Sequence, residues 1–144
     1  MLLTTKGKYA IIACIDLAKM IIERNEKISV YEIAEKQKIS VAYLEQIFSK
    51  LKNYGIVSST KGPNGGYLFL KNINEIKLLD IIKAVEENIK MTNCEECRAT
   101  KRIGENKLKC DGHTLWKALG DHINNFFENI TLQNAVDGKF ETKI

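Results

Sequence analysis

The 144-residue sequence contains one proline and nine glycines, too few for long irregular or low-complexity segments. No apolar run approaches the roughly 18 residues of a membrane-spanning helix. The first residues also lack the apolar stretch and small-residue cleavage site of a secretory signal peptide. We therefore expect a cytoplasmic protein that does not enter a membrane. Its length suits one domain, or a small domain with an appended element.

The sequence also lacks the motifs that mark common enzyme classes. It has no phosphate-binding loop, no dinucleotide-binding glycine fingerprint and no Ser/His/Asp set. His122 is a lone histidine on a predicted helix, where we expect it to face solvent. The sequence therefore predicts that the protein is not an enzyme.

The net charge of +4 is unevenly distributed along the chain. Residues 1–90 carry 14 Lys/Arg and 10 Asp/Glu, whereas residues 91–144 carry eight of each. Within residues 36–61, five lysines accompany one acid, Glu45. A solvated basic face has the same composition, but such a concentration of positive charge also attracts phosphates.

Three helices are predicted in the first part of the chain. Apolar residues recur at helical spacing over residues 6–22, and Cys14 within them is expected to be a small buried thiol. Ser29 begins a capping-box sequence and starts a short second helix. Ser40 caps a longer third helix over residues 40–54. Two such helices joined by a tight turn are typical of a helix-turn-helix.

A β-hairpin is predicted directly after the helix-turn-helix. Residues 56–60 and 67–70 have the composition of strands, and the glycine-rich segment 61–66 forms the turn between them. A hairpin at this place is the wing of a winged helix-turn-helix. A fourth helix is predicted over residues 78–88.

A last helix is predicted over residues 114–130, followed by a polar tail. Its apolar side chains recur at helical spacing; they are Leu115, Leu119, Ile123, Phe126, Phe127 and Ile130, with Trp116 beside them. The helix either packs on its own domain or pairs with a second chain. We favour pairing, because DNA-binding proteins of this type are usually two-fold symmetric.

The predicted fold is thus mainly α with a small β-hairpin: a winged helix-turn-helix plus a C-terminal dimerisation helix. We expect four parts. They are a DNA-binding domain over residues 1–89, a cluster-binding loop over 90–112, the dimerisation helix over 113–132 and a flexible tail over 133–144.

The third helix is expected to enter the major groove of duplex DNA with its N-terminal side chains at the base edges. Gln46 can pair with adenine, while lysines suit phosphates. A basic residue on a thin wing suits a narrow minor groove. The predicted DNA-binding residues are Lys6, Tyr9, Ser40, Val41, Ala42, Tyr43, Glu45, Gln46, Lys50, Lys61, Gly62, Pro63, Gly65 and Gly66.

Glu45 is the exception among these residues, because a carboxylate repels phosphate and is favourable only beside a donor such as cytosine N4. It is either a surface acid paired with Lys52 or another helix neighbour, or a residue that rejects some DNA sites and permits others.

Cys94, Cys97, Cys110 and His113 form a C-x2-C-x12-C-x2-H array. Three thiolates and one imidazole can hold a tetrahedral zinc or a small iron–sulfur cluster. Cytoplasmic thiols stay reduced, which argues against structural disulfides. The spacing alone favours a zinc site. Thiol redox sensing without a metal is a weaker option, because it leaves His113 without a role.

Six segments resemble the iron–sulfur cluster regulators of the Rrf2 family, which are bacterial winged-helix transcription factors. The segments keep one order over nearly the whole chain: LTTKGKYA at 3–10, YLEQIFSKL at 43–51, GIVSS at 55–59, GPNGGYL at 62–68, KCDGHTLW at 109–116 and NITL at 129–132. The resemblance implies a homodimer that binds promoter DNA as a repressor or activator of iron–sulfur assembly genes. It also implies a cluster on the three cysteines and His113, with cluster-bound and apo forms preferring different DNA motifs. The acid at Glu45 is implied to take part in that choice.

The chain departs from the family pattern at two places. The family spaces its three cysteines more evenly, and it often has an arginine where Lys61 stands, so the planar guanidinium fork is lost. With the resemblance included, we favour a 2Fe-2S cluster and a cluster-sensing regulator. The alternative is a winged-helix regulator stapled by zinc that senses no metal.

Overall fold

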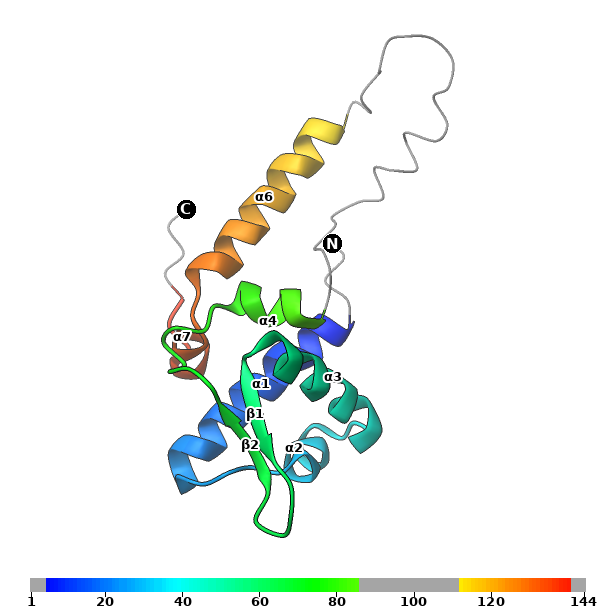
Figure 1. The fold of residues 1–144 in the computed structure, drawn as a ribbon. Coiled ribbons are helices and arrows are strands. Elements are labelled where there is room, and N and C mark those ends of the chain that lie inside the picture. The colour runs from blue at the N-terminus through cyan, green and yellow to red at the C-terminus, as the bar shows by residue number, and fades with distance from the viewer. Residues whose placement is uncertain (1–4, 86–111, 141–144) are drawn as a thin grey trace.

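The computed structural model describes residues 5–85 and 112–140. The chain forms helices around a small antiparallel hairpin, which confirms the predicted fold class (Figure 1). In chain order, the elements are α1 (Thr5–Arg24), α2 (Val30–Gln37), α3 (Val41–Tyr54), β1 (Val57–Thr60), β2 (Gly66–Phe69), α4 (Leu78–Val85), α6 (His113–Asn129) and α7 (Leu132–Asp137).

Helix α1 lies at the centre of the core, and α2, α3, α4 and α7 all contact it. Its inward residues include the small Ala10, Ala13 and Ala18, which allow neighbouring helices to approach closely. Cys14 is completely buried among them, as predicted. Large apolar side chains from the other elements, such as Phe48 and Leu44 of α3, fill the rest of the core.

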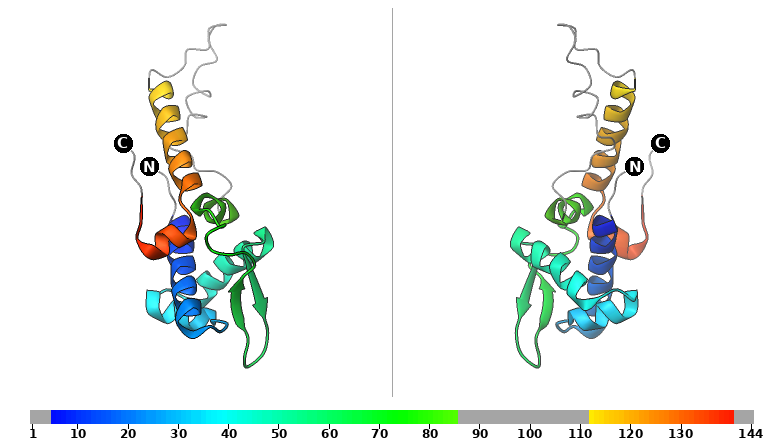
Figure 2. Two further views of the ribbon diagram at one scale, coloured as in Figure 1. Left: turned by 90° about the vertical axis from the view of Figure 1, so that its left-hand side faces the viewer. Right: turned by 90° about the vertical axis from the view of Figure 1, so that its right-hand side faces the viewer.

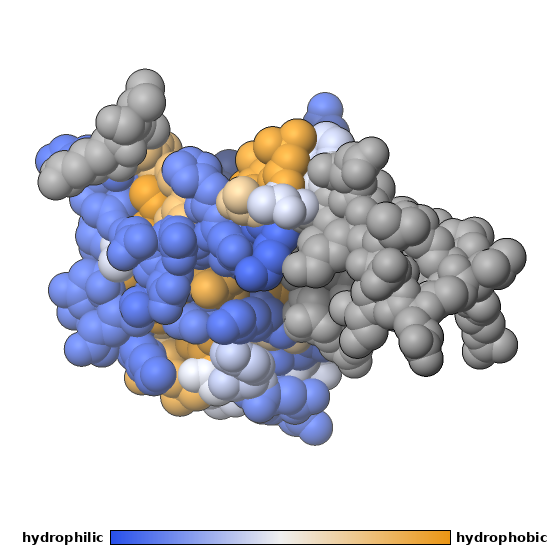
Figure 3. Space-filling view, turned by 90° about the horizontal axis from the view of Figure 1, so that it is seen from above, coloured by the Kyte–Doolittle hydropathy of each residue, from blue (hydrophilic) through white to orange (hydrophobic). Residues whose placement is uncertain are grey.

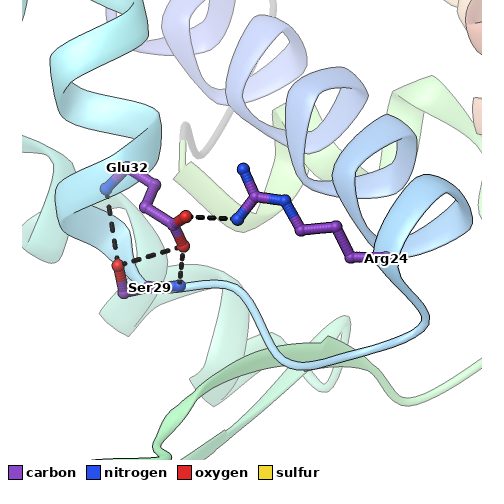
Figure 4. A network of polar contacts seen from close by, with 3 residues as sticks. All are labelled: Arg24, Ser29 and Glu32. Carbon is purple, nitrogen blue, oxygen red and sulfur yellow. Dashed lines mark hydrogen bonds and ion pairs between the residues drawn. The ribbon is translucent and has the colours of Figure 1, made fainter.

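The start of α2 is fixed by the predicted capping box, which Figure 4 shows from close by. The backbone N–H of Glu32 donates to Ser29 Oγ at 3.4 Å, and the N–H of Ser29 donates to Glu32 Oε2 at 3.3 Å. Arg24, the last residue of α1, pairs with the same carboxylate. The capping box therefore also joins the end of α1 to the start of α2.

The turn of the helix-turn-helix and both ends of α3 also follow the sequence. Lys38 ends α2 in the left-handed region, with φ 54°. Ser40 caps α3, its Oγ accepting a 3.1 Å hydrogen bond from the N–H of Tyr43. Gly55, at φ 87°, ends α3, and glycine adopts this conformation without a steric penalty.

The predicted wing is present, with strand ends shifted by one residue. Val57 pairs with Phe69 and Thr60 with Gly66 at the two ends of the ladder. Ile28, just before α2, pairs with Tyr67 on the other edge of β2 through hydrogen bonds of 2.8 and 3.3 Å. An isolated two-stranded hairpin is marginally stable, so this extra pairing helps to fix the wing.

Helix α6 projects away from the core in all three ribbon views (Figures 1 and 2). Its C-terminal end is anchored where residues 130–132 run beside residues 76–78. The N–H of Leu78 donates to the Ile130 carbonyl at 2.9 Å, and that of Leu132 donates to the Ile76 carbonyl at 2.7 Å. Most of α6 therefore extends beyond the core.

The expectation of a flexible tail over residues 133–144 is wrong for its first part, because residues 132–137 form helix α7. Thr131 and Asn134 make a second capping box at its start. Leu132 is fully buried, and Ala135 and Val136 pack against the core that includes α1. The polar composition of this segment hid a short apolar face.

The other predicted boundaries stay predictions. The fourth helix is described only as far as Val85, and most of the predicted loop 90–112 lies outside the described residues. Within the described residues, no helix is both long and apolar enough to cross a bilayer.

Candidate nucleic-acid interface

One face of α3 packs into the core and the other is exposed. Its buried side consists of Leu44, Ile47, Phe48 and Leu51. The predicted DNA-reading residues Ser40, Ala42, Glu45, Gln46 and Lys50 are exposed, whereas Val41 and Tyr43 are half-buried. The amphipathic spacing thus leaves the predicted base-reading side chains available to a ligand.

The first turns of α1 lie beside the start of α3. The rings of Tyr9 and Tyr43 meet edge to face, with centroids 5.9 Å apart and planes at 84°. Lys6 lies one helical turn before Tyr9. The structure therefore brings these three predicted residues from the two helices to one place, although Lys6 is separated from α3 by more than thirty residues in sequence.

The wing tip exposes Lys61, Gly62 and Pro63. Gly62 has φ 109°, and the N–H of Gly65 donates to its carbonyl at 2.9 Å, which closes the turn. A Cβ on Gly65 would lie 2.2 Å from the Thr60 carbonyl oxygen. The tip therefore depends on glycine to bring a single lysine to the end of a narrow loop.

Tyr67 joins the wing to α3. Its ring lies 4.7 Å from that of Phe48, at an angle of 52°. Burial raises the pKa of the Tyr67 hydroxyl, and the negative charge of Glu45 raises it further. Glu45 therefore acts electrostatically on the junction between the wing and the recognition helix.

The structure bears on the two interpretations of Glu45. Lys52 donates a 2.7 Å hydrogen bond to Ser59 Oγ. The ion pairs found in the described residues are Arg24–Glu32 and Lys36–Asp16, so Glu45 is in neither. Its exposed carboxylate is thus not neutralised by Lys52, which favours the interpretation that it discriminates between DNA sites.

Sequence reasoning missed one basic residue at the wing. Lys27 Nζ donates a 2.9 Å hydrogen bond to Thr60 Oγ1, directly before Lys61. Nothing in the sequence signals this contact, because Lys27 lies in the connection between α1 and α2 and its partner is 33 residues away.

The predicted metal ligands Cys94, Cys97 and Cys110 lie outside the described residues. His113 is the first residue of α6. In residues 5–85 and 112–140, no group of three or more His, Cys, Asp or Glu side chains is placed to hold a metal ion. The ligand set stays a prediction from the sequence.

Known proteins resemble the chain over almost its full length. The model of the Rrf2 family, described as an iron-dependent transcriptional regulator, matches residues 3–138. The HTH-type transcriptional regulator IscR of Pectobacterium atrosepticum is 42% identical over 142 residues, which cover 96% of this chain and 81% of the relative. The protein of the same name from Serratia proteamaculans is 39% identical over the same shares.

Solved structures give the same picture. CymR, the global cysteine regulator of B. subtilis, has a TM-score of 0.76 and 28% identity, covering 96% of this chain and 98% of its own. IscR of T. potens has a TM-score of 0.74 and 28% identity, covering 100% of this chain and 92% of its own.

Proposed function

The chain belongs to the Rrf2 family of iron-dependent transcriptional regulators, and we propose that it senses the state of an iron–sulfur cluster and changes its choice of promoter accordingly. It is a DNA-binding transcriptional regulator, and its relatives are regulators, which confirms the prediction that it is not an enzyme. One observation carries the proposal: an exposed DNA-reading helix and a Cys3His array that ends on α6 occur in the same chain.

We assign the two parts of the interface to the two grooves of duplex DNA. The exposed side of α3 presents Gln46 and Glu45 to base edges in the major groove. The wing tip carries Lys61 to the minor groove. Lys6 and Lys50 bind phosphates, which give affinity without sequence information. A promoter-binding protein of this kind acts where the chromosome lies, in the cytoplasm.

We assign the projecting helix α6 to homodimer formation. Leu115 is 62% exposed, and Leu119, Phe126 and Trp116 are each 37–40% exposed. Seen from above, hydrophobic atoms reach the surface between hydrophilic ones (Figure 3). Exposed apolar side chains on one helix mark an interaction surface, and a second copy of α6 would cover them.

The donor set fits an iron–sulfur cluster. Cys94, Cys97 and Cys110 supply three thiolates and His113 supplies one imidazole, the mixed ligation that holds 2Fe-2S clusters and raises their reduction potential. When bound, such a cluster supplies reversible one-electron chemistry and can be lost to iron limitation or oxidants. His113 starts α6, so ligation at this residue acts directly on the predicted dimerisation helix and can change the spacing of the two DNA-binding domains.

The zinc alternative uses the same four residues but gives a closed structural site with no redox response. Protein purified without oxygen separates the two. We expect a brown protein that contains iron and sulfide. A colourless protein with one zinc per chain would establish the alternative function.

A Cys110→Ala variant tests the link between the cluster and promoter choice. We expect it to lose the visible absorption and to change its relative affinities for two different promoter fragments. Equal preferences for wild type and variant, measured with the wild-type cluster intact, would reject cluster-controlled site choice.

A further inference from the structure

Two lysines hold the first strand of the wing from opposite sides. Lys52 Nζ, from the end of α3, donates to Ser59 Oγ at 2.7 Å. Lys27 Nζ, from the connection before α2, donates to Thr60 Oγ1 at 2.9 Å. Consecutive strand residues point to opposite faces of a hairpin, so the two ammonium groups lie on its two faces.

The approach of Lys27 depends on a glycine in the neighbouring strand. Ile28 pairs with Tyr67, so β2 lies between Ile28 and β1. Gly66 is directly opposite Thr60, and a Cβ on Gly66 would lie 2.7 Å from the Ile28 carbonyl oxygen. Because Gly66 has no side chain, the backbone at Ile28 comes close enough for Lys27 to reach across β2 to Thr60.

Neither lysine loses its charge in these contacts. A hydroxyl group accepts the hydrogen bond but carries no charge of its own. The ion pairs of the described residues use Arg24 and Lys36 instead. With Lys61 directly after Thr60, positive charge stands on both faces of the wing and at its tip.

We propose that Lys27 is a phosphate-binding residue for duplex DNA and that, with Lys52, it straddles the wing. The minor groove of B-DNA is about 6 Å wide and is bordered by two phosphate backbones. A hairpin tip in that groove therefore has a row of phosphates on each side, and each lysine faces one row. Ser59 and Thr60 hold the two side chains in place before DNA arrives, which lowers the entropy lost on binding. This inference rests on the proposed DNA-binding function.

The test is a salt titration of duplex binding with the full chain. Lys27→Gln removes the charge, while Lys27→Arg keeps it. We expect Lys27→Gln to reduce the slope of log K against log salt by about 1, since each phosphate contact contributes about 0.9. Its affinity should fall roughly three- to tenfold near 0.1 M salt, on specific and unrelated duplexes alike. Lys27→Arg should retain the wild-type slope.

Lys139→Gln is the matched control, because Lys139 is exposed and follows α7, outside the wing. It should bind as wild type does. A wild-type slope for Lys27→Gln would overturn the assignment of Lys27 alone. An equal loss of slope in Lys27→Arg would also overturn it, since the effect would then come from structure and not from charge. If the wild type bound no duplex DNA, the proposed function would fail as well.

Discussion

The carboxylate of Asp16 on α1 accepts a 2.8 Å hydrogen bond from the ammonium group of Lys36, near the end of α2. Its other oxygen accepts from the side-chain amide of Gln37. The Asp16 side chain is 8% exposed, whereas that of Lys36 is 50% exposed. This buried acid therefore ties α2 to the central helix and fixes the first half of the helix-turn-helix.

Breaking this pair should destabilise the fold in a non-additive way. Lys36→Met leaves the Asp16 charge buried with only Gln37 as partner, and we expect a loss of about 1.5–3 kcal/mol in the free energy of unfolding. Asp16→Asn in the same background should cost less than in wild type, giving a coupling energy of about 1 kcal/mol. Urea unfolding at one fixed protein concentration measures all four proteins. Strictly additive losses would show that the pair does not stabilise the fold.

The Arg24–Glu32 contact predicts an acid-sensitive capping box. The hydrogen bond from Arg24 lowers the pKa of Glu32 below 4.5, against an opposing effect of burial and with further help from Ser29. A lowered native pKa stabilises the fold above the unfolded value and is lost as the pH falls through the native one. The stability difference between wild type and Glu32→Gln should therefore be largest above pH 4.5 and vanish in stronger acid.

Thermal unfolding over this pH range measures the effect. Glu35→Gln is the control, because Glu35 is an exposed acid on the same helix with no such contact in the described residues. A stability difference for Glu32→Gln that does not change with pH would exclude the ionised carboxylate as its source.

Cys14 should be chemically silent in the native protein. Burial raises the pKa of its thiol to about 12, and the thiolate is the form that reacts. Iodoacetamide near neutral pH should leave Cys14 unmodified until urea is added, as peptide mass spectrometry would show. Rapid native alkylation would contradict the buried position.

The same raised pKa predicts a loss of stability in alkali. Above pH 9 the unfolded chain releases the thiol proton while the native protein keeps it, so stability falls as the pH rises. The stability advantage of wild type over Cys14→Ala should therefore narrow above pH 9. A constant difference up to pH 10 would count against this assignment.

Much of the fold follows from local chemistry and could be predicted from the sequence. Ser29, Ser40 and Gly55 are placed as a capping box, an N-cap and a C-terminal glycine, and each was found in that role. Helix α7 was missed because its six residues are too few to be stable alone. It depends on Leu132 packing in the core, which polar composition does not reveal.

The contacts that assemble the interface could not be predicted, because they join distant residues. Tyr9 meets Tyr43, and Lys27 meets Thr60, only after the helices have packed. No periodicity or spacing encodes these pairs; the core of α1 and α3 sets them. The sequence therefore identified the interface residues on α3 and at the wing tip but not the lysine on the far face of the wing.

The exposed stripe on α6 yields a last prediction, about assembly. Leu115, Leu119 and Phe126 recur at helical spacing on one side of the helix and are all exposed. If a second copy covers them, Leu119→Lys buries a charge at the interface and should convert the dimer to a monomer in sedimentation velocity. Affinity for a two-fold symmetric duplex should then fall more than tenfold, because the two half-sites are no longer bound together. Asp121→Lys places the same side chain about half a turn away on the helix, where Asp121 is exposed, and should remain dimeric. A dimeric Leu119→Lys protein would show that chains associate through another surface.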